Sequence, residues 1–175
     1  MRRAAVTYIV LLAALAGCRD ARRDAPVQAS YDNIGKLRLL TYDSDGNAKP
    51  DTWAYMDGTR VLRVDVDKNE DGVIERREYY DARKALEKVE ISTTSDGKIT
   101  RTEFYDAGAL ARAEEDTNAD GNVDRWETYA NGLVQSVAFD IDGTGHPTRR
   151  LVYAGDGRLL QIETGGDLAS RVLKR

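Results

Sequence analysis

Residues 105–129, YDAGALARAEEDTNADGNVDRWETY, contain one complete unit of the repeat that decides the fold. The unit opens with a small polar turn at 106–108 and continues through a short alternating segment into an acidic turn at Asp120-Gly121. A second alternating segment then ends at the next tyrosine. Asp-Gly and Asn-Gly between alternating segments are strong hairpin signals, because these residues tolerate positive φ. The unit therefore predicts two strands joined by turns.

The same unit recurs along most of the chain. Its tyrosines stand 24 or 25 residues apart, at positions 31, 55, 80, 105, 129 and 153. A fixed period in this range indicates a repeat architecture. The Asp-Gly turns fall at 45–46, 71–72, 96–97, 120–121 and 142–143. The outer two units depart from the common spacing and contain Pro50 and Pro147, as expected of capping units.

We predict an all-β fold in which about a dozen short antiparallel strands follow one another as a meander over residues 31–175. Segments 59–66 and 133–139 are short and rich in valine, which favours strands. Residues 164–175 are expected to form a truncated last strand. Residues 74–91 offer a helical alternative, since they are good helix formers with Glu/Lys pairs. The pattern leaves open whether the sheet stays open, curls or closes into a barrel.

Two stretches match the twelve-residue calcium loop D-x-[DN]-x-[DN]-G-x5-E: residues 67–78, DKNEDGVIERRE, and 116–127, DTNADGNVDRWE. Oxygen atoms at positions 1, 3, 5, 7, 9 and 12 of such a loop surround a hard cation, and Gly at position 6 permits the turn. The sequence thus predicts up to two Ca²⁺ sites. Their ligands are Asp67, Asn69, Asp71, the Val73 carbonyl, Glu75 and Glu78, and Asp116, Asn118, Asp120, the Asn122 carbonyl, Asp124 and Glu127.

Two observations support a non-metal interpretation of these loops. Asp and Asn bond their own backbone in turns and Gly supplies positive φ, so the pattern is also good turn chemistry. In addition, Glu103 keeps the position-12 place although its own loop has lost two acidic ligands. Arg76/Glu78/Tyr80, Arg101/Glu103/Tyr105 and Arg125/Glu127/Tyr129 share a strand parity and predict Arg, Glu and Tyr rows on one face. The glutamates at position 12 could serve these rows instead of a metal.

The loops resemble calcium loops of the EF-hand type and the D-x-D-x-D-G repeats of thrombospondin type 3 and dockerin modules. The Y-x-x-G-x-L frame between the loops is similar to MORN-like and YD-type β-hairpin repeats. MORN-like units usually carry more glycine and aromatic residues than this chain, and YD repeats belong to very large exported proteins.

The N-terminal region indicates export. Arg2 and Arg3 precede the apolar run 9–17, IVLLAALAG, which is too short to span a bilayer. Residues 15–18, LAGC, resemble the lipobox of bacterial lipoproteins, which implies that residues 1–17 are a signal helix, that Cys18 is lipidated and that it anchors the chain in a membrane. Arg19, rather than Asp, follows this cysteine, so the resemblance implies the outer membrane. Residues 18–30 then form a flexible tether.

Charge and residue content exclude several functions. The net charge is −4, and loss of residues 1–17, which hold two arginines and no acid, would change it to −6; such a chain is not expected to bind nucleic acid. The sequence has one histidine, His146, which we place in a surface turn, and no nucleophile elbow, P-loop or H-E-x-x-H motif.

We therefore expect a non-enzymatic protein: a lipid-anchored, calcium-binding repeat module that contacts an envelope protein or glycan. The alternative is an immunity- or inhibitor-type lipoprotein that binds a toxin or hydrolase without metal.

Overall fold

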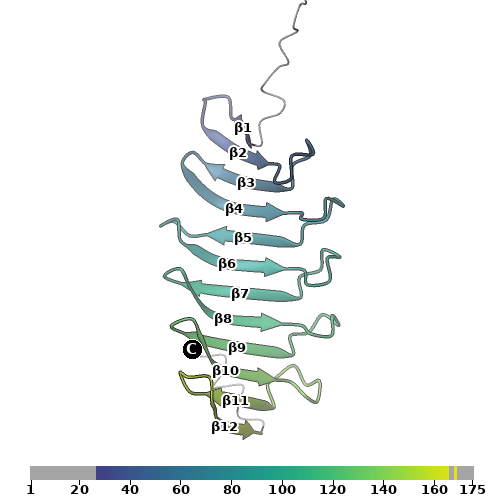
Figure 1. Cartoon of the computed structure of the whole chain (residues 1–175), viewed down its shortest axis with the longest axis vertical. Coiled ribbons are helices and arrows are strands. Elements are labelled where there is room, and N and C mark those ends of the chain that lie inside the picture. The colour runs from purple at the N-terminus through teal and green to yellow at the C-terminus, as the bar shows by residue number, and fades with distance from the viewer. Residues whose placement is uncertain (1–26, 166–167, 169–175) are drawn as a thin grey trace, which may run out of the picture.

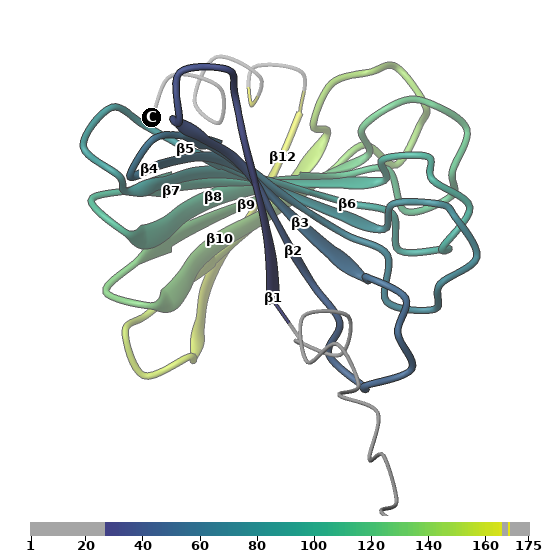
Figure 2. The same ribbon diagram turned by 90° about the horizontal axis from the view of Figure 1, so that it is seen from above.

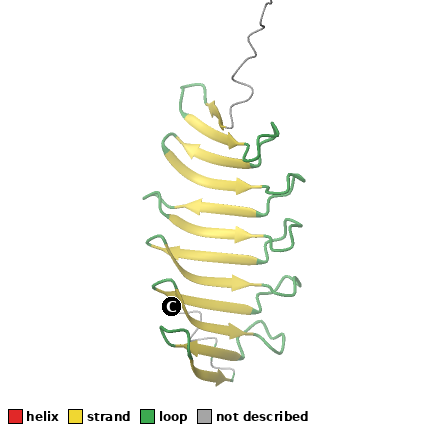
Figure 3. Cartoon of the chain, in the orientation of Figure 1, coloured by secondary structure: helices red, strands yellow, loops and turns green. Residues whose placement is uncertain are grey.

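The computed structural model describes residues 27–165 and Leu168, and this part of the chain is all-β, with no helix (Figure 3). Twelve strands of five to seven residues follow one another in sequence. Their bounds are β1 Val27–Tyr31, β2 Leu37–Tyr42, β3 Thr52–Asp57, β4 Arg60–Val66, β5 Arg76–Tyr80, β6 Leu86–Ile91, β7 Arg101–Asp106, β8 Ala109–Glu115, β9 Arg125–Ala130, β10 Leu133–Phe139, β11 Arg149–Tyr153 and β12 Leu159–Thr164.

All twelve strands belong to one antiparallel sheet in sequence order, so each strand pairs with its neighbours along the chain (Figure 1). Within the described residues, β1 and β12 are the two ends of the sheet and do not pair with each other. The sheet twists strongly about its long axis (Figure 2), as expected of right-twisted strands. The predicted meander is confirmed, and it is an open sheet, not a barrel.

The two long edges of the sheet differ. One edge carries short turns, and the other carries the five loops that contain the acidic pattern (Figure 1). The turn between β9 and β10 consists of Asn131 and Gly132, with φ values of 53° and 75°. Positive φ at both residues is the requirement of a two-residue type I′ hairpin, which explains why Asn-Gly stands there.

Residues 74–91 form strands, not a helix. They contribute β5 and β6, which are joined by a turn in which the Asp81 carboxylate accepts hydrogen bonds from the backbone N–H groups of Arg83 and Ala85, at 2.8 and 2.9 Å. Pairing on both sides, with β4 and β7, outweighs the helical propensity of this segment.

The sheet begins earlier than the sequence indicated. β1 starts at Val27, inside the segment 18–30 that we expected to be a tether. β12 ends at Thr164, and most of the expected last strand at 164–175 lies outside the described residues, as do the signal segment and Cys18.

Among residues 27–165, few side chains are fully buried, because the sheet has a single layer. Trp126 and Ala138 form a small buried cluster with Val123 packed against it, and Val89 is among the few other fully buried apolar side chains. Both faces therefore depend on contacts between rows of side chains. In the described part of the chain, no helix is long and apolar enough to cross a membrane.

Candidate metal site

The five long loops share one construction. They comprise residues 43–51, 67–75, 92–100, 116–124 and 140–148, numbered here as loop positions 1–9. In every loop the side chain at position 1 accepts a hydrogen bond from the backbone N–H of position 6, as Asp67 does from Gly72 at 2.9 Å. The side chain at position 9 accepts one from the N–H of position 2, as Glu75 does from Lys68 at 2.8 Å.

This shared construction changes how the outer loops compare with the central ones, which we had matched by their Asp-Gly pairs. Residues at positions 4 and 6 have positive φ throughout. Gly46 and Gly143 occupy position 4, whereas the central glycines, such as Gly72, occupy position 6. The outer units thus keep the common loop, and their Asp-Gly pairs are displaced within it by two residues.

The loop geometry does not depend on carboxylates. In loop 92–100, Ser92 Oγ accepts from Gly97 N–H at 3.1 Å, and Thr100 Oγ1 accepts from Thr93 N–H at 3.0 Å. Hydroxyl groups therefore replace both acidic side chains with the same result. Turn chemistry is common to all five loops, and any metal site must rest on features beyond it.

Such features occur in loop 67–75. Asp67, Asp71 and Glu75 each offer an oxygen atom, and these atoms lie within 4.8 Å of one another. Asp67 is only 3% exposed, and its Oδ1 has no hydrogen-bond partner, since Gly72 N–H donates to Oδ2. Glu75 Oε1 is likewise buried without a partner. Asp71 is exposed and accepts from Val73 N–H and Asn69 Nδ2, so the unpartnered oxygens are those of Asp67 and Glu75. Carboxylate oxygens that converge in this way suit a hard divalent cation.

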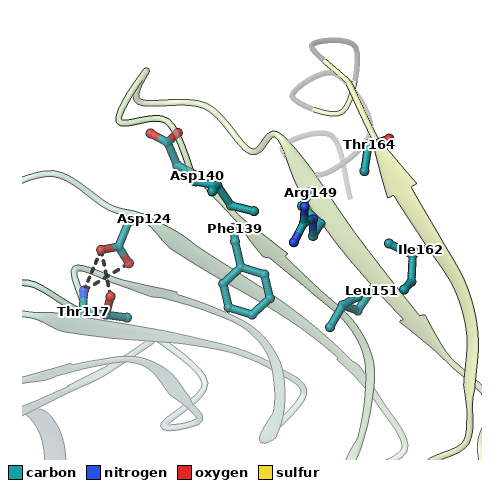
Figure 4. Close-up of a pocket in the computed structure, with 9 residues that line it drawn as sticks. Thr117, Asp124, Phe139, Asp140, Arg149, Leu151, Ile162 and Thr164 are labelled. Carbon is teal, nitrogen blue, oxygen red and sulfur yellow. Dashed lines mark hydrogen bonds between the residues drawn. The ribbon is translucent and has the colours of Figure 1, made fainter.

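In loop 116–124, the carboxylate oxygens at positions 1 and 9 already accept hydrogen bonds. Both carboxylate oxygens of Asp124 accept the N–H of Thr117, at 3.1 and 3.2 Å, and Oδ2 also accepts the Thr117 hydroxyl at 2.8 Å (Figure 4). Asp116 accepts from Asp120 N–H and Gly121 N–H through its two oxygens. The structure therefore does not gather Asp116, Asp120 and Asp124 into an open group as it does in the twin loop.

The predicted position-12 ligands lie in the side-chain rows of the sheet. The Glu78 oxygens accept from Arg76 Nε at 2.8 Å and from the Tyr80 hydroxyl at 2.7 Å. Glu127 accepts from the Tyr129 hydroxyl at 2.5 Å and from Arg101 Nη2 at 2.8 Å. Neither glutamate belongs to an acidic group that could hold a metal within the described residues.

These contacts confirm the predicted rows, which we call the Arg–Glu–Tyr ladder: residues 76, 78, 80, 101, 103, 105, 125, 127 and 129. Sequence reasoning missed a further member, Glu115 of β8, which lies 3.0 Å from Arg101 Nη1 and 3.5 Å from Arg125 Nη1. Its place next to the two arginines depends on the register between strands, in which Glu115 pairs with Arg101 and with Arg125.

The ladder shifts the acidity of its members. Burial raises the pKa of Tyr80, and the hydrogen bond to Glu78 adds to the effect, so that this pKa is about 12. Burial alone would also raise the pKa of Glu127, but the hydrogen bonds from Tyr129 and Arg101, with the arginine charges, hold it below its usual value. Glu127 is therefore ionised at neutral pH and accepts hydrogen bonds from Tyr129 and Arg101.

The opposite face carries a second row, in which cations lie over aromatic rings. Arg63 lies 4.3 Å from the centre of the Tyr55 ring, Lys88 lies 4.4 Å from that of Tyr79, and Arg112 lies 3.4 Å from that of Phe104. The register places these six residues side by side across β3 to β8. Cation–π contacts of this kind contribute about 0.5–1 kcal/mol each at exposed sites.

The loop edge is strongly acidic. The five loops carry thirteen acidic residues and three lysines. This concentration of negative charge attracts cations from solution, and it favours occupation of any cation site among the loops.

A groove of about 620 Å³ lies beyond the ladder, over β10, β11 and β12 (Figure 4). Phe139, Leu151 and Ile162 line it together with Arg149. Leu151 stands where the central units have glutamate, so the ladder gives way to apolar residues here. None of the predicted metal ligands other than Asp124 lines this groove.

No protein-family model and no curated protein matches the sequence. Accessory secretory proteins 1, 2 and 3 of Streptococcus pneumoniae are 16% identical, with a TM-score of 0.41 over 70% of this chain and 20% of that one. The GtfA/B complex bound to UDP and GlcNAc is 10% identical, with a TM-score of 0.25 over 79% of this chain and 24% of that one. This chain thus spans a quarter or less of either protein, and likeness at this level carries no functional argument.

Proposed function

We propose that this protein is a lipid-anchored, non-catalytic repeat module of the bacterial envelope, at the outer membrane. In this proposal it presents an extended sheet to an envelope protein or glycan and binds calcium at its loop edge. The observation that carries the proposal is the single-layer sheet itself. Over the central strands, one face carries the Arg–Glu–Tyr ladder and the other carries the row of cations over aromatic rings, and the single layer leaves both faces as broad surfaces for contact.

The side-chain chemistry supports a binding role over catalysis. The carboxylates of the ladder are paired with arginine and tyrosine, as Glu103 is with Arg101 at 3.0 Å and with Tyr105 at 2.9 Å. The lowered pKa of Glu127 makes this group a poor general acid near neutral pH, because it is already deprotonated.

The anchor rests on the lipobox-like LAGC sequence at residues 15–18. A Cys18→Ser variant tests it in a bacterial expression host with labelled fatty acid. We expect the unchanged chain to take up label and sediment with membranes, and the variant to do neither. Equal labelling of both proteins, or sedimentation of neither, would contradict the anchor.

The calcium-binding part of the proposal is based on loop 67–75, which has buried carboxylate oxygens without hydrogen-bond partners. Calcium in extracellular modules binds with Kd on the order of 10⁻⁴–10⁻³ M, which suits a protein outside the cytoplasm. Titration of the purified protein with calcium, followed by its melting temperature, tests this part of the proposal.

A further inference from the structure

We propose that the chain binds a single divalent cation, at Asp67, Asp71 and Glu75, and that the second complete loop and both position-12 glutamates take no part. This inference rests on the calcium binding of the proposed function and narrows it to one site with its own ligand set. It departs from the loop pattern in the sequence, which offers two sites and a closing glutamate in each.

The first step is the free coordination capacity of loop 67–75. The acidic group alone would not define a site. Asp67, however, is 3% exposed and keeps Oδ1 buried without a hydrogen-bond partner. Leaving such an oxygen unpaired is costly in a folded protein, and a cation beside it removes that cost. Glu75 Oε1, from position 9, is in the same condition.

The second step is the difference between the twin loops, which share Asp, Asn, Asp and Gly at positions 1, 3, 5 and 6. At position 9, Glu75 uses Oε2 for the Lys68 N–H and keeps Oε1 for a cation. Asp124 is shorter, and the Thr117 N–H and hydroxyl together engage both of its oxygens. Asp120 Oδ1 additionally accepts from the Asn122 side chain at 3.0 Å.

The third step is the position of the glutamates at position 12. Glu78 is held between Arg76 and Tyr80, and binding to a loop cation would require it to abandon both. Charge-assisted bonds of this kind are among the strong ones. Glu75 therefore supplies an oxygen to the cation in place of Glu78, and it does so through Oε1 alone, because Oε2 accepts the Lys68 N–H.

Stoichiometry distinguishes the single site from two sites. Isothermal titration of the full chain with CaCl₂ should give one site per molecule. Glu75→Gln should weaken binding by more than about tenfold, whereas Glu78→Gln and Asp124→Asn should change the affinity by less than about threefold. Circular dichroism of each variant shows whether the sheet is retained. Asp67→Asn provides a second loss variant if Glu75→Gln does not fold.

The double substitution Thr117→Lys/Asp124→Glu gives loop 116–124 the residues of its twin at positions 2 and 9. We expect a second binding event in this variant, and its absence would overturn the assignment of the difference to these two positions.

Two sites in the unchanged protein, or loss of binding in Glu78→Gln with retention in Glu75→Gln, would overturn the single-site inference while the proposed calcium binding survived. Absence of any heat of binding at millimolar calcium, with the same melting temperature in calcium and in EGTA, would overturn both.

Discussion

Arg101 of β7 donates to Glu127 of β9 over 2.8 Å, although β8 lies between the two strands. The residue of β8 in register between Glu103 and Glu127 is Ala113, which is 1% exposed. Its small side chain lets the arginine pass over β8, so the ladder joins two strands that are not neighbours, through residues 26 positions apart in the sequence.

Removal of this bridge should destabilise the sheet more than removal of a surface ion pair. In Arg101→Gln, Glu127 loses a partner at a site where its side chain is only 5% exposed. We expect a loss of about 2–3 kcal/mol in the free energy of unfolding, somewhat below the ~3–5 kcal/mol for breaking a fully buried pair. Urea unfolding measures it. The matched control is Arg83→Gln, which removes an exposed pair with Asp81 and should cost below about 0.5 kcal/mol. Equal losses would contradict a special role of the bridge.

Ala113→Leu should block the same bridge from β8. Overpacking costs typically about 1–3 kcal/mol, and we expect this loss to overlap with that of Arg101→Gln, since both variants remove the contact between Arg101 and Glu127. A double-mutant cycle measures the overlap. Strict additivity of the two losses would mean that the arginine does not pass over Ala113.

Acid should weaken the ladder through Glu127. The pKa of this group is lowered in the folded protein, where burial opposes the shift and the contacts with Tyr129 and Arg101 outweigh it. The unfolded chain therefore binds the proton more readily, and the stabilisation is present above the unfolded pKa of about 4.3 and is lost as the pH falls through the lower folded value. Between about pH 5 and pH 3, the unchanged protein should lose more free energy of unfolding than Glu127→Gln. Parallel pH profiles would contradict this assignment.

Adjacent long loops pack on one another through Gly97. A Cβ atom there would lie 2.7 Å from Val73 Cγ1, and the φ of Gly97 is +80°. Gly97→Ala should therefore combine backbone strain of about 1–2 kcal/mol with a clash. Gly121→Ala is the control, since its φ is +95° but no atom lies within 4 Å. Adding Val73→Ala should recover the extra loss at Gly97, and failure to do so would exclude this loop contact.

The stability of loop 92–100, in which hydroxyl groups replace the acidic side chains, should depend on Thr100, which is 5% exposed. Thr100→Val keeps the shape of the side chain but removes the acceptor of the Thr93 N–H. We expect a loss of about 1–2 kcal/mol, the penalty for a buried polar group left without a partner. Thr59→Val, at an exposed turn, should change stability by less than about 0.5 kcal/mol. Equal free energies of unfolding in the two variants would mean that the hydrogen bond to position 9 does not stabilise the loop.

The sequence predicted the fold well because its signals are local. The tyrosine period and the Asp-Gly and Asn-Gly turns place nearly every strand, and the parity of Arg76, Glu78 and Tyr80 places the ladder on one face. The openness of the sheet could not be predicted, since it depends on the pairing of strands at opposite ends of the chain. The row of cations over Tyr55, Tyr79 and Phe104 also requires the register between strands.

The candidate site was predictable in part. The five loops repeat an acid or threonine at position 9, and this regularity was visible in the sequence. The sequence did not predict which carboxylate oxygens stay without a hydrogen-bond partner. That depends on the residue at position 2, which is Lys68 in one loop and Thr117 in the other, and on the side chain at position 9, where Asp124 is shorter than Glu75.

The most direct measurement is a thermal melt of the purified protein in EGTA and during a calcium titration, with Asp67→Ala and Asp116→Ala as the paired variants. With a Kd on the order of 10⁻⁴ M and about 10⁻³ M calcium, binding should add about 1.4 kcal/mol to the free energy of unfolding. This corresponds to a rise of about 3–6 °C. We expect a saturable rise that magnesium does not reproduce, that Asp67→Ala abolishes and that Asp116→Ala retains. Identical melting curves in EGTA and calcium would contradict calcium binding and leave the five loops as hydrogen-bonded turns.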